Sequence, residues 1–181
     1  MKTMRKHIRT AAVAAVLAAG TALGSIAAVG TALASEDTGF VDGKAGTHDD
    51  WNDEGTLAKD DTSNAVALWQ TVLWADGAKW KAKNGTLKSF TQDDITGDFN
   101  SRTVSATKFW QAGNGLKQTG KADGASFSLA DNNLGSANKK GLVIYDGVID
   151  ETVQFKRLTV AGVTQQVYFV KVDDEWVAAA Y

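Results

Sequence analysis

The chain of 181 residues has no cysteine and no proline, and it has only two histidines. Without cysteine it can form no disulfide and carry no cysteine-linked lipid, so its stability must come from a hydrophobic core. Of the two histidines, His48 alone lies beyond the first 34 residues. Zinc hydrolases, Cys/His nucleophilic pairs and Ser-His-Asp triads all need more His or Cys than this. Most hydrolytic mechanisms are therefore excluded, and we expect no cofactor.

Charge is missing from a long stretch near the start of the chain. Residues 11–34 carry no charged side chain and end in Ala32-Leu33-Ala34, the small-x-small pattern that a signal peptidase cleaves. Four cations precede this stretch, namely Lys2, Arg5, Lys6 and Arg9. The pattern predicts a secretory signal over residues 1–34 and a secreted protein with no stable membrane association after cleavage. An uncleaved anchor is the alternative, because the stretch could span a bilayer, but its Ala, Gly and Thr residues are only weakly apolar.

The acidic charge of the remaining chain is concentrated at its start. Without the first 34 residues, 15 Lys and Arg face 21 Asp and Glu, which gives a net charge of −6. Residues 35–61 hold nine acids and two lysines, whereas residues 62–181 hold twelve acids and thirteen bases. A near-neutral body argues against nucleic acid as a partner, since phosphate binding requires a basic face. We expect residues 35–61, which show no apolar period, to form an acidic linker.

One part of this linker matches the spacing of a calcium-binding loop. Such a loop places oxygen ligands at alternate positions, a glycine at its turn and a final carboxylate. The matching residues are Asp50, Asn52, Glu54, Gly55, Leu57 and Asp61. Glu at the fifth position and Asp at the twelfth are atypical, and no helix is predicted before the loop. A solvated linker is therefore the favoured interpretation, and we expect no metal site.

Helical signals begin at residue 62 and continue to about residue 136. Thr62 or Ser63 can cap a helix whose apolar residues recur three and four positions apart, with Gly77 as its stop. Those apolar residues are Ala65, Val66, Trp69, Val72 and Leu73. A second capped helix is predicted from Asn100 or Ser101 to about residue 113, and a short third helix over residues 126–132. Residues 78–95 are predicted to be a long polar connection.

Residues 137–181 have the signals of β-structure instead. Strands are predicted over residues 142–145, 152–160, 163–172 and 175–180, with turns at residues 146–147, 161–162 and 173–174. A sheet of this size is marginal by itself, so we expect it to pack on the helices. The predicted fold class is α+β, with a helical domain over residues 62–136 followed by a small antiparallel β-meander.

The helical region contains an internal repeat. Residues 96–103 align with residues 119–126 without a gap, and each segment brings a glycine-containing turn to the start of a helix. Gln70 and Gln111 each follow a tryptophan, Trp69 and Trp110, at the same helical register. We expect both tryptophans to lie in the core and both glutamines to bond loop backbone groups, with ligand contact as the alternative role of the glutamines. For Trp176 we favour sheet packing over a platform for a sugar, and we assign neither role to Trp51 or Trp80.

These motifs resemble the small helical peptidoglycan-binding domain of bacterial wall enzymes. The resemblance covers residues 64–135 and depends on five elements that follow one another at the family's spacing. They are Val66-x-x-Trp69-Gln70-x-x-Leu73, Gly97-x-Phe99-x-x-x-Thr103, Ala106-Thr107-x-x-Trp110-Gln111, Gly115-Leu116 and Gly120-x-x-Asp123-x-x-Ser126. The sequence departs from the family in its longer connection after the first helix and in Asn100 and Asp123, which replace turn glycines. The resemblance implies a three-helix bundle that binds peptidoglycan.

Four residues are the predicted ligand contacts: Phe99, Arg102, Gln111 and Asn114. Phe99 and Arg102 lie on a turn between elements, where binding residues are often carried on a rigid scaffold. The fork of an arginine suits the carboxylates of a muropeptide, although a solvated charge at a helix start is the alternative for Arg102. Asn114 is either a ligand contact or a simple helix cap.

Together these observations predict a non-catalytic protein, extracellular or associated with the cell wall, whose partner is peptidoglycan. One alternative is a secreted interaction protein that targets or inhibits a wall hydrolase, which would then be a second partner. Another is a glycosidase that uses two carboxylates, drawn from Asp93-Asp94, Asp150-Glu151 or Asp173-Asp174-Glu175. We favour turn formation for these adjacent acids and expect no catalytic residues.

Overall fold

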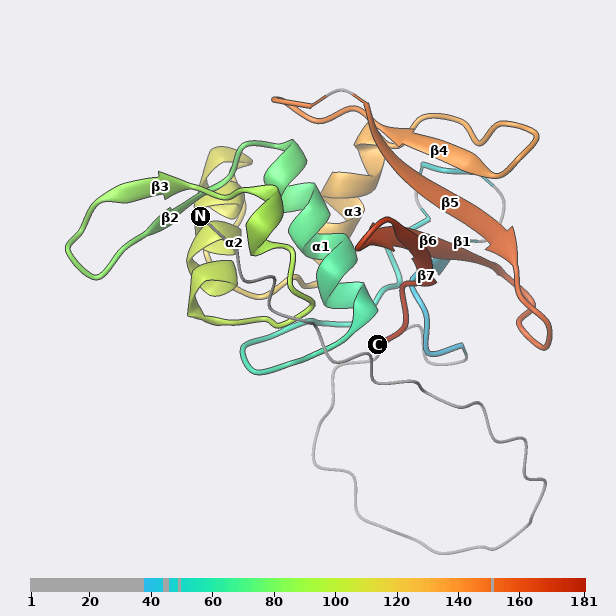
Figure 1. Cartoon of the computed structure of the whole chain (residues 1–181), viewed down its shortest axis with the longest axis horizontal. Coiled ribbons are helices and arrows are strands. Elements are labelled where there is room, and N and C mark those ends of the chain that lie inside the picture. The colour runs from blue at the N-terminus through green and yellow to red at the C-terminus, as the bar shows by residue number, and fades with distance from the viewer. Residues whose placement is uncertain (1–37, 44–45, 49, 151) are drawn as a thin grey trace, which may run out of the picture. The chain divides into compact units, whose positions relative to one another are not determined.

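The computed structural model describes residues 38–43, 46–48, 50–150 and 152–181. All of these residues belong to one compact unit (Figure 1). The predicted signal over residues 1–34 lies outside the described residues. Within the described ranges, no helix has the length and apolarity that a membrane span requires.

The described chain contains helices in its first half and a sheet built mainly from its second half. The helices are α1 (Asn64–Ala75), α2 (Ser101–Gly113) and α3 (Gly124–Ala130), with 3-10 turns η1 (Gln92–Asp94) and η2 (Asp131–Asn133). The strands are β1 (Asp42–Gly43), β2 (Lys79–Lys81), β3 (Leu87–Ser89), β4 (Leu142–Tyr145), β5 (Val153–Thr159), β6 (Gln166–Val172) and β7 (Glu175–Ala178). The α+β class is therefore confirmed.

Side-chain caps determine where the helices begin. The Ser63 hydroxyl accepts a hydrogen bond from the backbone N–H of Val66 at 3.1 Å, and Asn100 Oδ1 accepts from Arg102 N at 2.9 Å. Each bond satisfies a backbone donor that the first helical turn would otherwise leave without a partner. The predicted starts of α1 and α2 are confirmed.

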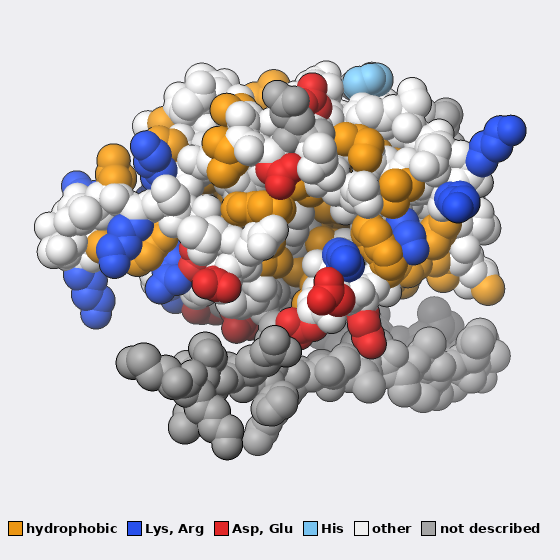
Figure 2. Space-filling view, turned by 45° about the horizontal axis from the view of Figure 1, so that its top comes forward, with side chains coloured by type: hydrophobic (Ala, Val, Ile, Leu, Met, Phe, Trp, Pro, Cys, Tyr) orange, Lys and Arg blue, Asp and Glu red, His pale blue; other side chains and the backbone are white. Residues whose placement is uncertain are grey.

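The large sheet is antiparallel and curled. Strands β4, β5, β6 and β7 pair in chain order, and β1 also pairs with β6. The four predicted strands match β4 to β7 closely, and the β6–β7 turn has positive φ angles of 47° at Asp173 and 68° at Asp174. β1 was not predicted. A separate hairpin, β2–β3, lies within the predicted polar connection and projects from one end of the molecule, where several basic side chains lie on the surface (Figures 1 and 2).

The predicted three-helix bundle is wrong. α1 contacts α2 and also strands β6 and β7, and ten of its twelve residues are buried (Figure 1). α3 has only seven residues, too few to form the third side of a bundle. The physical reason is visible in the α1 sequence, which has no charged side chain. A helix that is apolar on every side has to be covered on every side, and here the sheet provides that cover.

The segment predicted as an acidic linker contributes to the core in its described part. Trp51 is fully buried, and its ring packs edge-on against Phe127, Phe155 and Tyr168, with centroids 6.1, 5.8 and 5.2 Å away. Val41 is also buried in the core. One hydrophobic cluster thus joins this segment, the helices and the sheet.

The acids in the segment with calcium-loop spacing bind other protein side chains. Asp50 forms a buried ion pair with Arg157, with Nε and Oδ2 3.0 Å apart, and accepts a 2.6 Å hydrogen bond from the Tyr168 hydroxyl. Glu54 accepts a hydrogen bond from the Tyr181 hydroxyl at 2.8 Å. Among the described residues, no three His, Asp or Glu side chains are grouped to hold a metal ion.

Candidate functional site

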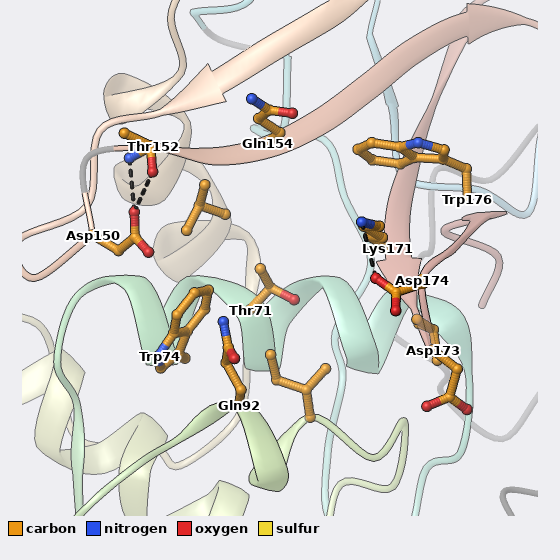
Figure 3. Close-up of a pocket in the computed structure, with 13 residues that line it drawn as sticks. Thr71, Trp74, Gln92, Asp150, Thr152, Gln154, Lys171, Asp173, Asp174 and Trp176 are labelled. Atoms are coloured by element: carbon orange, nitrogen blue, oxygen red, sulfur yellow. Dashed lines mark hydrogen bonds and ion pairs between the residues drawn. The ribbon is translucent and has the colours of Figure 1, made fainter.

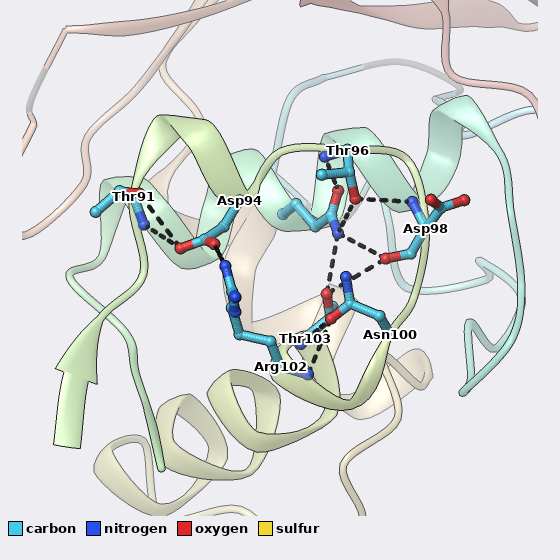
Figure 4. Close-up of polar contacts among 8 residues, drawn as sticks. Thr91, Asp94, Thr96, Asp98, Asn100, Arg102 and Thr103 are labelled. Carbon is cyan, nitrogen blue, oxygen red and sulfur yellow. Dashed lines mark hydrogen bonds and ion pairs between the residues drawn. The ribbon is translucent and has the colours of Figure 1, made fainter. Parts of the chain in front are cut away.

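Gln70 of α1 fixes the turn that leads into α2. Its Oε1 accepts hydrogen bonds from the backbone N–H groups of Thr96 at 2.8 Å and Gly97 at 2.9 Å. Its Nε2 donates to the carbonyl of Asp98 and to the Thr103 hydroxyl, both at 2.9 Å (Figure 4). Because Gln70 is fully buried, these bonds satisfy an amide that has no access to water.

Gln111 of α2 repeats this arrangement one helix later. Its Oε1 accepts from Gly120 N at 2.9 Å, and its Nε2 donates to the carbonyl of Lys121 at 2.9 Å and to the Ser126 hydroxyl at 3.0 Å. Gly97 and Gly120 have φ angles of 75° and 71°, a backbone region that favours glycine. The predicted repeat and the predicted bonding of both glutamines to loop backbone are confirmed.

Trp69 and Trp110 form the contact between α1 and α2. Their rings pack edge-on with centroids 5.2 Å apart, and both side chains are buried. Trp69 Nε1 donates to the Thr107 hydroxyl at 3.0 Å, and Trp110 Nε1 donates to Asp76 Oδ2 at 2.6 Å. The predicted core role of both tryptophans is confirmed.

The four predicted ligand contacts do not lie on one surface. Phe99 and Gln111 are fully buried, while Asn114 caps the end of α2 and donates to the carbonyl of Trp110 at 2.9 Å. Arg102 lies at the other end of α2, about 18 Å from Asn114 along the helix axis. Of these four residues, Arg102 lines a surface cavity.

A basic hollow opens between the β2–β3 hairpin and the start of α2. It has a volume of about 440 Å³, and its lining residues are Trp80, Lys81, Lys83, Asn100, Ser101 and Arg102. Arg102 forms an ion pair with the buried carboxylate of Asp94 (Figure 4), and its guanidinium lies 4.3 Å from the centroid of the Trp80 ring. The hairpin segment, residues 79–89, holds four lysines and no acid. We call this cavity the basic hollow.

A second cavity lies between α1 and the sheet. It also has a volume of about 440 Å³, and we call it the α1–sheet cleft. Residues from α1, η1 and strands β5 to β7, with the loops beside them, line the cleft and bring two tryptophans, two glutamines and several acids together (Figure 3). They include Trp74, Gln92, Asp150, Gln154, Lys171, Asp174 and Trp176. Trp176, for which sheet packing was favoured, therefore lines a cavity.

Two of the acids that line the cleft, Asp150 and Asp174, have polar partners. Asp150 Oδ1 accepts from the backbone N–H and the hydroxyl of Thr152, at 2.9 and 2.7 Å. Asp174 forms an ion pair with Lys171, with Nζ and Oδ1 3.1 Å apart. Both contacts stabilise turns, which is the role favoured for these acids in the sequence.

Raised pKa values are found at a buried carboxyl group, Glu54, and a half-buried one, Asp76, neither of which lines a cavity. Burial raises the pKa of Glu54 to about 8, against hydrogen bonds from Asp42 N and Tyr181 that lower it. Burial also raises the pKa of Asp76, against hydrogen bonds from Trp110 and Tyr145. These shifts belong to polar contacts inside the core.

Comparison of the chain with family models, with curated proteins and with solved structures finds no match. What the protein binds is therefore inferred from the geometry of its two cavities.

Proposed function

We propose that this protein binds bacterial cell-wall peptidoglycan without cleaving it, and that the basic hollow is the binding site. The observation that carries the proposal is the position of three cations, Lys81, Lys83 and Arg102, around one cavity beside the Trp80 ring. A muropeptide presents carboxylates, amides and sugar rings. Cations suit the carboxylates, and the apolar surface of an aromatic ring suits the apolar side of a sugar.

Arg102 is held in place before any ligand arrives. The Asp94 carboxylate binds one of its terminal nitrogens, and the guanidinium makes a cation–π contact with the Trp80 ring. A guanidinium has five N–H donors in a fixed fork, so one group can hold Asp94 and a ligand carboxylate together. The entropy cost of ordering this side chain is therefore met during folding rather than during binding.

The repeated glutamine-turn contacts support the proposal in a second way. They are the structural counterpart of the motifs by which the sequence resembles a peptidoglycan-binding domain. Gln70 holds the turn whose last residue, Asn100, lines the basic hollow. The motif residues would thus act by shaping the loop beside the site and not by touching the ligand.

Sedimentation with purified wall sacculi tests the proposal. The double variant Lys81→Ala/Lys83→Ala should lose most of its binding, and the loss should be largest at low salt, where charge contacts are least screened. Lys139→Ala/Lys140→Ala is the matched control, because it removes two exposed lysines outside the lining of the basic hollow. It should bind like the parent protein.

Three other outcomes would contradict the proposal. Equal binding by both double variants would remove the basic hollow from the site. Clearing of the suspension would favour a carboxylate-dependent glycosidase. Failure to sediment, together with recovery of a wall hydrolase in pull-downs, would favour the interaction protein.

The proposal also includes export, since peptidoglycan lies outside the bacterial membrane. Export depends on the predicted cleavage after Ala34. Sequencing the N-terminus of protein from culture medium should give Ser35 as the first residue, and an intact Met1 on membrane-bound protein would contradict release.

A further inference from the structure

We propose that the α1–sheet cleft is a second binding site, which takes a neutral oligosaccharide. The proposal does not depend on the basic hollow, because the two cavities share no lining residue. The sequence did not predict it, because the lining residues come from α1, η1 and the sheet, which are far apart along the chain.

Two indole rings provide the apolar part of this site. Trp74 projects from α1 and Trp176 from β7, so the rings reach the cleft from two different layers of the fold (Figure 3). The face of an aromatic ring is negative, and the C–H groups on one face of a sugar ring are slightly positive, so the two faces pack favourably. The Lys156 ammonium lies 4.6 Å from the centroid of the Trp176 ring, within the range of a cation–π contact.

The polar part of the lining matches sugar hydroxyls, which both donate and accept hydrogen bonds. Gln92 and Gln154 are exposed and line the cleft, and each carboxamide offers donors and an acceptor. Asp150 and Asp174 add acceptors, and two hydrogen bonds from Thr152 orient the Asp150 carboxylate. A few placed polar groups among aromatic side chains are typical of small-molecule sites, and about 440 Å³ lies within their usual range of volumes.

Charge decides between a neutral ligand and an anionic one. Three acids line the cleft, Asp150, Asp173 and Asp174, against two cations, Lys171 in the lining and Lys156 beside the Trp176 ring. This excess of negative charge repels carboxylates and phosphates. The basic hollow has three cations and the opposite preference. The two cavities therefore select ligands of different charge, and an uncharged glycan is the one that fits the cleft.

Calorimetric titration of the whole protein with the neutral trimer of N-acetylglucosamine tests this inference. We expect saturable binding, a Kd raised about tenfold by Trp176→Ala, and a smaller loss with Trp176→Phe, which keeps an aromatic face. Gln154→Ala should also weaken binding. Its matched control is Gln118→Ala, which removes an exposed carboxamide outside the lining of the cleft and should keep the parent Kd.

Three outcomes would overturn the inference. They are absence of binding by a folded protein, an unchanged Kd in Trp176→Ala, and an equal loss of affinity in Gln154→Ala and Gln118→Ala. Thermal melting of each variant separates loss of the site from loss of the fold. Trp176 and Gln154 line the cleft and not the basic hollow, so the effect of their variants on the titration reports on the cleft whether or not sacculi bind at the basic hollow.

Discussion

Glu54 is a carboxyl group enclosed by the core. It accepts hydrogen bonds from Asp42 N at 2.7 Å and from the Tyr181 hydroxyl at 2.8 Å. Burial raises its pKa from 4.5 to about 8, and the nearby charges of Asp42 and Asp53 act in the same direction. Between these two pKa values the folded protein binds more protons at this position than the unfolded chain does. The free energy of unfolding contributed by Glu54 therefore falls as the pH rises from about 4.5 to about 8.

Replacing Glu54 by Gln should remove this pH dependence. A carboxamide cannot ionise, its oxygen can accept from Asp42 N, and its NH2 group can donate to the Tyr181 hydroxyl oxygen. Urea unfolding at pH 5 and pH 9 should show the parent losing a few kcal/mol that Glu54→Gln retains. Glu175→Gln changes an exposed glutamate and should keep the slope of the parent. An unchanged slope in Glu54→Gln would assign the pH dependence to other groups.

Trp110 allows packing and hydrogen bonding to be separated at one position. Trp110→Ala removes a buried ring and should lower the free energy of unfolding by about 3–5 kcal/mol. Trp110→Phe keeps most of the ring but loses the N–H that Asp76 accepts, so we expect a loss of about 1–3 kcal/mol. Denaturant unfolding of both variants checks the order. Equal losses would mean that ring volume contributes little here.

At the scale of elements, the loop after β4 is fitted closely to the end of α1. The Ala75 carbonyl accepts hydrogen bonds from Ile149 N at 2.9 Å and Asp150 N at 3.3 Å. A Cβ added to Gly147 would lie 2.7 Å from both Cβ and the carbonyl oxygen of Ala75. Because this contact involves backbone atoms, Gly147 and Ala75 can move apart only if the loop loses its hydrogen bonds to the end of α1.

Gly147→Ala should therefore destabilise the protein by about 1–3 kcal/mol, the usual cost of overpacking. Gly113→Ala is the control, because nothing lies within 4 Å of its Cβ position and the residue is the last of α2. Alanine has the higher helix propensity, so this variant should match or slightly exceed the parent in thermal stability. A neutral Gly147→Ala would show that the loop relaxes away from α1.

The elements that could be predicted from the sequence are those with local signals. Caps at Ser63 and Asn100 marked two helix starts, and alternation with turn residues marked β4 to β7. The β2–β3 hairpin has mostly exposed side chains, so it lacks the apolar alternation that marks a strand. β1 has two residues, Asp42 and Gly43, and only its pairing with β6 makes it a strand.

The candidate sites were less predictable, because most of their residues come from elements without a local sequence signal. The Gln70 and Gln111 contacts could be predicted because a repeated local motif encodes them. Arg102 was predicted on its turn, but its neighbours Trp80, Lys81 and Lys83 come from a hairpin with no sequence signal. The α1–sheet cleft exists only after β7 has brought Trp176 near α1, and no local pattern contains that information.

For the whole molecule, the shared core connects segments that the sequence divided into a linker, a helical domain and a β-rich extension. α1 is buried against α2 and against the sheet, and the Trp51 ring packs against Phe127 of α3 and against Phe155 and Tyr168 of the sheet. Removing any one of these segments exposes apolar surface on the others. The burial free energy lost in this way would be a large part of the roughly 5–15 kcal/mol that stabilises a typical domain.

A fragment of residues 62–136 should therefore not fold independently. It retains all three helices but loses the sheet that covers one side of α1. A fragment of residues 62–181 keeps strands β4 to β7 but lacks β1, Trp51 and Asp50, so the buried guanidinium of Arg157 loses the carboxylate that pairs with it. Circular dichroism and amide hydrogen exchange should show a cooperative transition for residues 35–181 and none for residues 62–136. Residues 62–181 should melt at a much lower temperature than residues 35–181, or not cooperatively. A cooperative transition in residues 62–136 would instead make the helical region an independent domain, with the sheet as an addition to it.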